Sequence, residues 1–256
     1  MLLKFPDADI FATRFGAGDR CLVAHGGWVG SGEMWLPPFE HLSRHWRTVT
    51  YDHRGTGATT HRRPEITFEM LVDDLFRVLD ALEITSCVLA GESSGALVVL
   101  EAALRQPHRF QGLVLVGGRA SSSQTAGAVR FIEGCRADFN ATMDAFVDAC
   151  ITEDDAEAEK HWGRRIVKRS NGRDAAQLMQ AMWSARVEDR LGEIVQPTLL
   201  IHGRNDRINP VAMSESMAAR IPDAKLVVFE DAGHVPVITR GAAVAREIED
   251  YFASRT

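Results

Sequence analysis

The chain has 256 residues, of which 45% are hydrophobic and 25% are charged, and its formal net charge is −6. This length and composition suit one substantial globular core, or a core with a small appendage. The acidic balance argues against a nucleic-acid-binding surface, which would need an excess of basic residues.

The N-terminal residues, "MLLKFPDADI", lack the long apolar core and the small-residue cleavage site of a signal peptide. No later apolar run approaches the roughly 20 residues that cross a bilayer. The stretch "LLKFPDADIFATRFGAGD" is typical of a β-hairpin followed by a loose turn. We therefore expect a cytoplasmic protein with no membrane partner, whose chain opens with a hairpin.

Short apolar runs then alternate with longer helical patterns. The runs predicted as strands are "RCLVAHGG", "RTVTYDHRG", "SCVLAGES", "GLVLVGG", "PTLLIHG" and "KLVVFED". Their hydrophobicity is continuous, which is typical of strands that are covered on both faces in a parallel sheet. Residues 67–83 and 243–253 repeat apolar side chains at helical spacing. This alternation predicts a doubly wound α/β sheet with helices on both faces.

One segment, residues 119–190, departs from this alternation because it is polar and helical and has no strand-like run. We interpret it as a small helical cap inserted over the carboxyl edge of the sheet, where open α/β sheets bind ligands. Residues 1–118 and 191–256 would then form the core. The aromatic residues of the cap, Trp183 among them, either line a substrate pocket or only pack its helices.

The stretch "VLAGESSGALV" places Gly91, Ser93 and Gly95 in a G-x-S-x-G pattern between a predicted strand and a predicted helix. A sharp turn that exposes a serine hydroxyl strains the backbone, and glycines on both sides relieve the collisions. Ser93 is centred between the glycines, so it is the candidate nucleophile. Ser94 would contribute its backbone N–H at the start of the helix, where an anion is favoured. The alternative is an ordinary strand-to-helix turn without chemistry.

A serine needs a base and an acid that orients the base. Asp206 follows the strand "PTLLIHG", and His234 follows the strand "KLVVFED". Strands of a parallel sheet end at one edge, so both side chains are expected near Ser93. The order Ser, Asp, His is the one that this architecture uses.

Each partner has a rival. His202 lies within a strand end, which favours a structural role for it. Asp231 and Glu230 stand too close to His234 in the sequence to approach it from a neighbouring strand. Asp206 itself could instead cap the helix that follows it. We retain Asp206 as the acid and His234 as the base.

The stretch "AHGGW" ends the first predicted parallel strand in a glycine pair. Acyl transfer turns a carbonyl oxygen into an anion that needs two N–H donors. We expect Gly27 to supply one N–H beside that of Ser94. Trp28 is assigned, with Trp183, to substrate binding, although it could only pack. His25 is expected to hydrogen-bond the loop backbone.

The sequence contains no recognisable metal or cofactor motif. The four cysteines form no Cys-x-x-Cys pair, so neither zinc nor a redox dithiol is indicated. His41 and His45 are spaced for one helix face but lack a third ligand, and we interpret them as solvent-facing. We therefore expect no metal and no cofactor.

The motifs "HGGW", "YDHRGTGAT", "GESSG", "HGRNDRINP" and "DAGHVP" together resemble the α/β-hydrolase family over essentially the whole chain. The resemblance implies a Ser-His-Asp triad on an eight-stranded, mostly parallel sheet with a helical cap. It also implies that Asp52 and Arg54 hold loops together in a structural turn. Ser93 sets the chain apart from relatives that use an aspartate nucleophile. Glu92, beside the nucleophile, is a departure from the family, and its side chain either faces the site or points into the sheet.

These features predict a serine hydrolase that cleaves a small carboxylic ester or lactone through an acyl-enzyme. Three alternatives stay open: a receptor-like or partner-binding protein with little turnover, a cofactor-free perhydrolase, and a C–C hydrolase that uses the same triad. Neither the natural substrate nor the oligomeric state can be read from the sequence.

Overall fold

The structure is a computed structural model of the chain, and it describes residues 1–253 and 255. In this part of the chain, eight strands form one sheet in the order β1-β2-β4-β3-β6-β7-β8-β9, and a short strand, β5, pairs with β2. The strands are β1 (Leu2–Lys4), β2 (Ala8–Phe15), β3 (Arg20–His25), β4 (Trp46–Tyr51), β5 (Thr60–His61), β6 (Cys87–Glu92), β7 (Phe110–Val116), β8 (Thr198–Gly203) and β9 (Ala224–Phe229).

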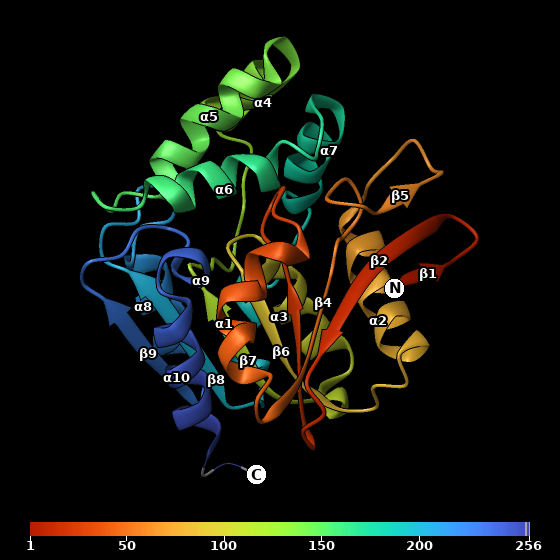
Figure 1. The fold of residues 1–256 in the computed structure, drawn as a ribbon, viewed down its shortest axis with the longest axis vertical. Helices are drawn as coiled ribbons and strands as arrows, with labels where there is room; N and C mark the ends of the chain where they lie inside the picture. Colours follow the sequence, from red (N-terminus) through yellow and green to blue (C-terminus); the bar gives the residue numbers. More distant parts are fainter. Residues whose placement is uncertain (254, 256) are drawn as a thin grey trace.

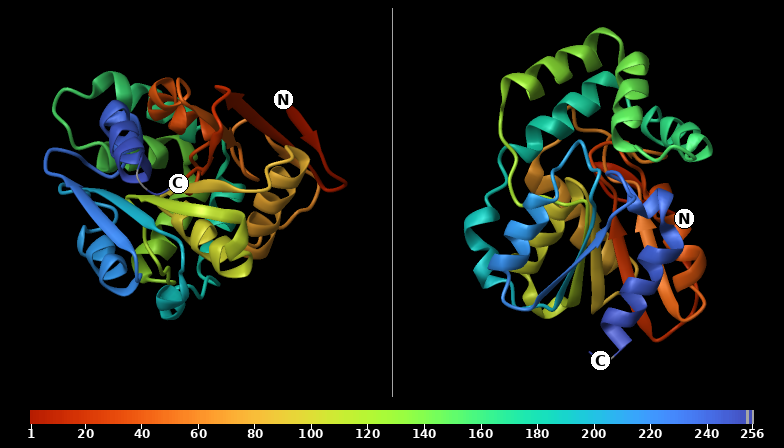
Figure 2. Two further views of the ribbon diagram at one scale, coloured as in Figure 1. Left: turned by 90° about the horizontal axis from the view of Figure 1, so that it is seen from below. Right: turned by 90° about the vertical axis from the view of Figure 1, so that its left-hand side faces the viewer.

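Helices cover both faces of the sheet. They are α1 (Leu36–Leu42), α2 (Phe68–Ala81), α3 (Gly95–Arg105), α4 (Ala126–Ala137), α5 (Phe139–Cys150), α6 (Glu157–Val167), α7 (Gly172–Met182), α8 (Ala212–Arg220), α9 (Pro236–Thr239) and α10 (Gly241–Ala253). Figure 2 shows α1 and α10 on one face and α2, α3 and α8 on the other. The predicted eight-stranded α/β-hydrolase fold is confirmed.

The strands pair as their hydrophobicity predicts. β1 and β2 form the expected antiparallel hairpin, and β2 pairs antiparallel with β4. From β4 to β9 all neighbours are parallel. β6 and β8 are buried along their whole length, which explains why their sequences do not alternate. The carboxyl ends of β3, β6, β8 and β9 therefore meet at one edge.

The helix predicted over residues 67–83 is α2. The Thr67 side chain accepts a hydrogen bond from the Met70 N–H at 3.2 Å and so caps its first turn. Its apolar residues at helical spacing, including Leu71, Leu75 and Val78, are fully buried, which is the stripe that an amphipathic helix places against a sheet.

Helices α4 to α7 lie above the carboxyl edge of the sheet (Figure 1). They come between β7 and β8 in the chain, as the predicted helical character of residues 119–190 requires. The division of the chain into a core and a cap stays a prediction. No helix in residues 1–253 is both long and apolar enough to cross a membrane.

The "YDHRG" turn ties loops together. Asp52 accepts hydrogen bonds from the N–H groups of Gly32 and Ala58 at 2.9 and 2.7 Å. The fully buried Arg54 guanidinium donates to both carboxylate oxygens of Asp74, at 2.5 and 3.0 Å. Both residues thus have the structural role that the resemblance implied.

Candidate active site

Ser93 occupies the turn between β6 and α3 with a φ of +52°, in the left-handed region. A β-carbon at Gly91 would lie 2.6 Å from a Val99 methyl group, and one at Gly95 would lie 2.4 Å from the Gly26 carbonyl oxygen. The flanking glycines are therefore required by close packing. The strained turn raises the Ser93 hydroxyl above the edge of the sheet.

Ser93, His234 and Asp206 form one hydrogen-bonded chain. His234 Nδ1 lies 2.7 Å from Asp206 Oδ2, and His234 Nε2 lies 2.9 Å from Ser93 Oγ. A carboxylate can only accept, so Nδ1 donates to it and Nε2 is left to accept from the Ser93 hydroxyl. The structure thus brings the predicted nucleophile, base and acid together in the order that proton transfer needs.

Asp206 is held by further donors. The N–H groups of Ile208 and Asn209 both donate to Oδ1 at 2.8 Å, and His202 Nε2 lies 3.0 Å from Oδ2. Burial alone would raise the pKa of Asp206, but the hydrogen bonds from His202 and His234 outweigh it and hold that pKa well below its usual range. The carboxylate therefore stays ionised beside the imidazole.

The rival acids point elsewhere. Asp231 is exposed and pairs with Arg240 at 2.9 Å. Glu230 pairs with Arg204 at 2.9 Å. Neither contacts His234, as the sequence argument expected.

The loop after β3 lies against the nucleophile turn. The Gly27 N–H meets the Met34 sulfur at 3.5 Å, a weak acceptor that an oxyanion can displace. Ser94 is the N-cap of α3, where backbone N–H groups lack intrahelical acceptors. The Ser94 hydroxyl is buried without a hydrogen-bond partner in the described part of the chain. Any contribution of Ser94 to an oxyanion would thus come from its backbone.

The expectation for His25 is wrong. Its Nδ1 lies 2.9 Å from the Tyr51 hydroxyl, so the ring bonds a neighbouring strand. The imidazole that reaches the loop is His53, whose Nε2 lies 2.9 Å from the Gly27 carbonyl oxygen. Because parallel β3 and β4 place His25 opposite Tyr51, the pairing was set by sheet register, which the sequence alone did not reveal.

Comparison of the sequence with known protein families assigns the chain to one of them. The family model for the alpha/beta hydrolase fold matches residues 21–241. The chain belongs to the α/β-hydrolase-fold family.

Individual relatives of this α/β hydrolase differ in their named activities. It is 30% identical over 253 residues to "Putative carbamate hydrolase RutD" from Pseudomonas savastanoi, covering 92% of this chain and 94% of the relative. It is 28% identical to "Pimeloyl-[acyl-carrier protein] methyl ester esterase" from Nitrosomonas europaea, covering 91% of this chain and 95% of that one. The enol-lactonase structure from Burkholderia xenovorans superimposes with a TM-score of 0.90 at 24% identity, covering 96% of this chain and 97% of that one, and shares the fold.

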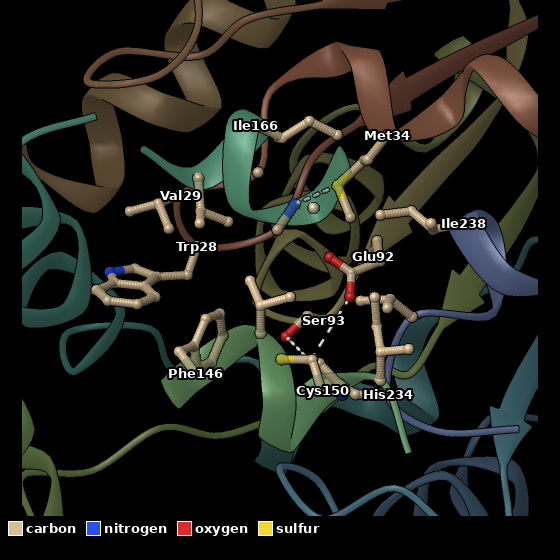
Figure 3. Close-up of a pocket in the computed structure, with 17 residues that line it drawn as sticks. Trp28, Val29, Met34, Glu92, Ser93, Phe146, Cys150, Ile166, His234 and Ile238 are labelled. Carbon is tan, nitrogen blue, oxygen red and sulfur yellow. Dashed lines mark hydrogen bonds and ion pairs between the residues drawn. The ribbon is translucent and has the colours of Figure 1, made fainter. Parts of the chain in front are cut away.

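A cavity opens at Ser93 of the hydrolase (Figure 3). Its walls come from the loop after β3, the end of β6, helices α5 and α6, and the segment from His234 into α9. The cavity volume is about 50 Å³, which is room for roughly three to five water molecules. Most of the lining side chains are apolar, among them Phe146, Ile166 and Ile238.

The two tryptophans assigned to substrate binding lie in different places. Trp28 lines the cavity, and its Nε1 donates to the Ala175 carbonyl of α7 at 2.8 Å. Trp183 is the C-cap of α7 and is not among the residues that line the cavity. Phe146 of α5 lies there instead, with its ring 5.3 Å from that of Trp28.

The C-terminal end of α5 holds the histidine loop. The His234 N–H donates to the Cys150 carbonyl at 2.8 Å, and the Gly233 N–H donates to Glu153 Oε1 at 3.2 Å. A β-carbon at Gly233 would lie 2.6 Å from the Cys150 oxygen, so glycine is required for this close approach. The helices above the sheet therefore help to place the base.

Glu92 faces the site. Its carboxyl group lines the cavity, and Oε1 lies 3.6 Å from His234 Nε2. Burial, with the negative charge of Asp206, raises its pKa well above the ordinary value, although Arg119 opposes the shift. The sequence left open whether this side chain faces the site or the sheet, and the structure decides for the site.

Sequence reasoning missed several other contacts. The contact between His202 and Asp206 was not predicted. The only signal for it in the sequence was that the two residues stand four positions apart at the end of a predicted strand. Met34, Phe146 and Cys150 also line the cavity, and no motif marks them. Among the described residues, no group of three or more His, Cys, Asp or Glu side chains is arranged to hold a metal.

Proposed function

We propose that this protein is a serine hydrolase that cleaves a small carboxylic ester or lactone through an acyl-enzyme, with Ser93, His234 and Asp206 as its triad. The observation that carries the proposal is the chain of hydrogen bonds of 2.9 and 2.7 Å that ends at a strained serine in a cavity.

In the acylation half, His234 Nε2 takes the Ser93 proton while Oγ attacks the substrate carbonyl. Asp206 fixes the tautomer of the imidazole and stabilises its cation. The N–H groups of Gly27 and Ser94 would hold the oxyanion, and the bond to Met34 is weak enough to be exchanged for it. The imidazolium then protonates the leaving alcohol.

The small apolar cavity supports a short acyl group. A cavity that holds only a few waters has room for an acyl chain of a few carbons. So short an acyl chain needs no charged side chain in the pocket to hold it. Trp28 is proposed as one wall of this pocket. Trp183, which lies away from the cavity, is proposed to act through the packing of α7.

A carbamate is the second candidate substrate. It is supported by the 30% identity to a relative named for carbamate hydrolysis. The same triad would attack its carbonyl in the same way, so the two candidates differ in substrate and not in machinery.

The first experiment is labelling of the purified protein with a fluorophosphonate, followed by mapping of the adduct by mass spectrometry. A single adduct on Ser93 that is lost in His234→Ala supports a working hydrolase. No adduct on folded protein would contradict the proposal and favour the receptor-like alternative. If Ser93 is labelled, but unlabelled enzyme prefers added peroxide or a β-diketone over esters and carbamates, the perhydrolase or C–C hydrolase alternative is favoured.

A matched pair of variants tests the assignment of the two serines. We expect Ser93→Ala to abolish turnover of p-nitrophenyl acetate while the fold is retained. We expect Ser94→Ala to keep most activity, because its contribution is a backbone N–H and its hydroxyl bonds nothing in the described chain. Equal loss in both variants would contradict the assignment.

A further inference from the structure

Glu92 is a buried acid without a structural partner. It is 2% exposed, and its Oε1 atom has no hydrogen-bond partner within residues 1–253 and 255. An unsatisfied buried polar atom costs roughly 1–3 kcal/mol, and such atoms in folded proteins call for an explanation. Because Oε1 makes no hydrogen bond to a loop or to a cation among the described residues, a structural role does not explain its burial.

The carboxyl group points at the reacting atoms. Figure 3 shows the carboxyl group of Glu92 in the cavity between Met34 and His234, with a dashed line that joins it to His234. Oε1 lies 3.6 Å from His234 Nε2, and the same nitrogen lies 2.9 Å from Ser93 Oγ. Glu92 Oε1 and Ser93 Oγ therefore both border the space around His234 Nε2.

This space is bounded on the far side by the loop after β3. A β-carbon added to Gly27 would lie 2.1 Å from Glu92 Oε2, so the carboxyl group is packed against the loop and cannot swing toward it. Packing against Gly27 thus keeps the carboxyl group on the His234 side of the loop. A molecule held by Oε1 and His234 Nε2 would lie close to the carbonyl carbon of an acyl group on Ser93.

We propose that Glu92 binds the hydrolytic water of the deacylation step and orients it between its Oε1 atom and His234 Nε2. This proposal rests on the proposed acyl-enzyme mechanism. One water molecule can span two atoms 3.6 Å apart with hydrogen bonds of ordinary length to both, and the site has to widen beside Oε1, which is fully buried in the free protein.

The step balances without a change in the charge of Glu92. The water donates one hydrogen to His234 Nε2 and the other to Glu92 Oε1. Its oxygen attacks the acyl carbonyl as Nε2 takes the first proton. The bond between the acyl carbon and Ser93 Oγ then breaks, Oγ takes the proton back from His234, and the carboxylic acid product leaves with the second hydrogen of the water on its new hydroxyl.

The electrostatics of the site favour a neutral Glu92 in this role. Burial and Asp206 raise its pKa, so the protonated form is favoured. A neutral carboxyl group does not oppose the developing oxyanion, and its carbonyl oxygen still accepts a hydrogen bond. An ionised Glu92 would repel the oxyanion across the same space.

The test compares water with methanol as the second substrate of the acyl-enzyme. Methanol has one hydroxyl hydrogen, which goes to His234, and none to give to Glu92. In Glu92→Met, which removes both oxygens, we expect hydrolysis of the acetyl-enzyme to fall by about 10- to 100-fold, while methanolysis changes much less. The ratio of methyl acetate to acetate formed from p-nitrophenyl acetate in dilute methanol therefore rises.

Other variants and readouts make the outcome unambiguous. The acylation burst in Glu92→Met is expected to stay within about threefold of wild type, with acetyl-enzyme accumulating in quenched mass spectra. Glu92→Gln keeps a carbonyl oxygen and is expected to restore the wild-type product ratio. Glu92→Leu removes the oxygens with another shape and is used if Glu92→Met does not fold. Glu230→Met, at an exposed acid, is the control and leaves the ratio unchanged.

Several results would overturn the proposal. An unchanged product ratio in both apolar variants means that Glu92 does not hold the water. A selective loss of the acylation burst means that Glu92 contacts the leaving group instead. Failure of wild-type protein to form an acetyl-enzyme would count against the proposed function itself, which separates the two hypotheses.

Discussion

Asp206 is shared by two histidines, which both contact its Oδ2 atom. His202 contacts the Asn209 carbonyl at 2.8 Å, and a carbonyl only accepts, so His202 Nε2 carries the proton. The Ser214 hydroxyl then donates to His202 Nδ1 at 2.7 Å. This fixed tautomer directs a hydrogen bond at the same Oδ2 atom that holds His234. His202 is thus a positioning residue for the acid.

Removal of this hydrogen bond is expected to move the pH profile. In His202→Phe, the Asp206 carboxylate loses a hydrogen bond that competes with His234, so it stabilises the His234 imidazolium more strongly. The acid limb of kcat/KM therefore moves to higher pH by about 0.5–1 unit. The free energy of unfolding falls by about 1–3 kcal/mol, because Ser214 and Asn209 lose their partner. The pH dependence of ester hydrolysis and urea unfolding measure the two effects.

The matched variant is His202→Gln, whose amide N–H can still reach Asp206. It should keep the acid limb near its wild-type position. An acid limb that stays in place in His202→Phe would show that the contact has no influence on the triad.

Glu92 also predicts a pH dependence of stability. Its pKa in the folded protein is raised well above 4.5 by burial and Asp206, against Arg119. An acid with a raised folded pKa stabilises the fold below its unfolded pKa and loses that contribution as pH rises through the folded pKa. Because Gln does not titrate, Glu92→Gln should gain stability relative to wild type between pH 5 and pH 8. Urea unfolding at both pH values measures this, and an equal difference at both would refute it.

Glu92 and His202 mark the limit of what the sequence predicts about individual residues. The meeting of Ser93, Asp206 and His234 was predictable because each follows a strand of a parallel sheet, and such strands end at one edge. The direction of Glu92 was not, because the alternation of side chains breaks where β6 enters the turn. The His202 contact depends on the conformation of the loop between β8 and α8, which spacing alone does not determine.

At the scale of elements, the segment after α5 acts as a support for the loop that carries His234. Glu153 is buried and accepts hydrogen bonds from the N–H groups of Gly233 and Thr152, at 3.2 and 2.9 Å. Together with the bond from His234 to the Cys150 carbonyl, these contacts fix a loop that would otherwise be free to shift the imidazole.

We therefore expect Glu153→Ala to lower activity although Glu153 touches neither substrate nor triad side chain. A displaced imidazole reduces kcat by about 10-fold or more, and the unpaired Gly233 N–H lowers the free energy of unfolding by about 1–3 kcal/mol. Steady-state kinetics and thermal unfolding test both effects. Asp154→Ala changes the exposed neighbouring acid and serves as the control; a similar loss in it would contradict the specific role of Glu153.

The helices above the sheet also explain why the pocket was only partly predictable. Their helical character follows from composition and spacing. Phe146 rather than Trp183 forms a wall of the cavity because of the side that α5 and α7 each turn toward the loop after β3. That rotation is set by packing, such as the contact of Trp28 with Phe131 and Phe146, and amphipathic periodicity does not specify it.

At the scale of the whole molecule, the buried Arg54 joins parts of the chain far apart in sequence. It bonds Asp74 on α2 and Asp7 before β2, the latter at 2.8 Å. Asp74→Asn removes one charge from this network and leaves Arg54 undercompensated in the core. We expect a loss of about 3–5 kcal/mol in the free energy of unfolding, measured by urea denaturation.

The control for this prediction is an exposed pair. Asp80, which is 66% exposed, bonds Arg109 at 2.9 Å. Asp80→Asn should cost no more than about 1 kcal/mol. Losses of equal size in the two variants would mean that burial does not set the strength of the network.

The overall fold was the most predictable level of description. Six apolar runs and the opening hairpin became eight strands of the sheet, since continuous hydrophobicity demands cover on both faces, while the short strand β5 was not predicted. The order of the strands in the sheet was not predicted, because pairing between strands distant in sequence is not encoded in any single run.

The pairing of β7 with β8 has a consequence for how such enzymes diverge. The chain leaves the sheet at the carboxyl end of β7, after Val116, and returns at the amino end of the adjacent strand β8, at Thr198, which pairs with Leu113. Helices α4 to α7 thus lie within a single connection between adjacent strands, so another helical segment can be grafted there without a change in strand order. Any graft has to supply a carbonyl oxygen where Cys150 meets the His234 N–H. Such a replacement changes the helices that wall the pocket, and with them the range of substrates, while the residues around Ser93 stay the same.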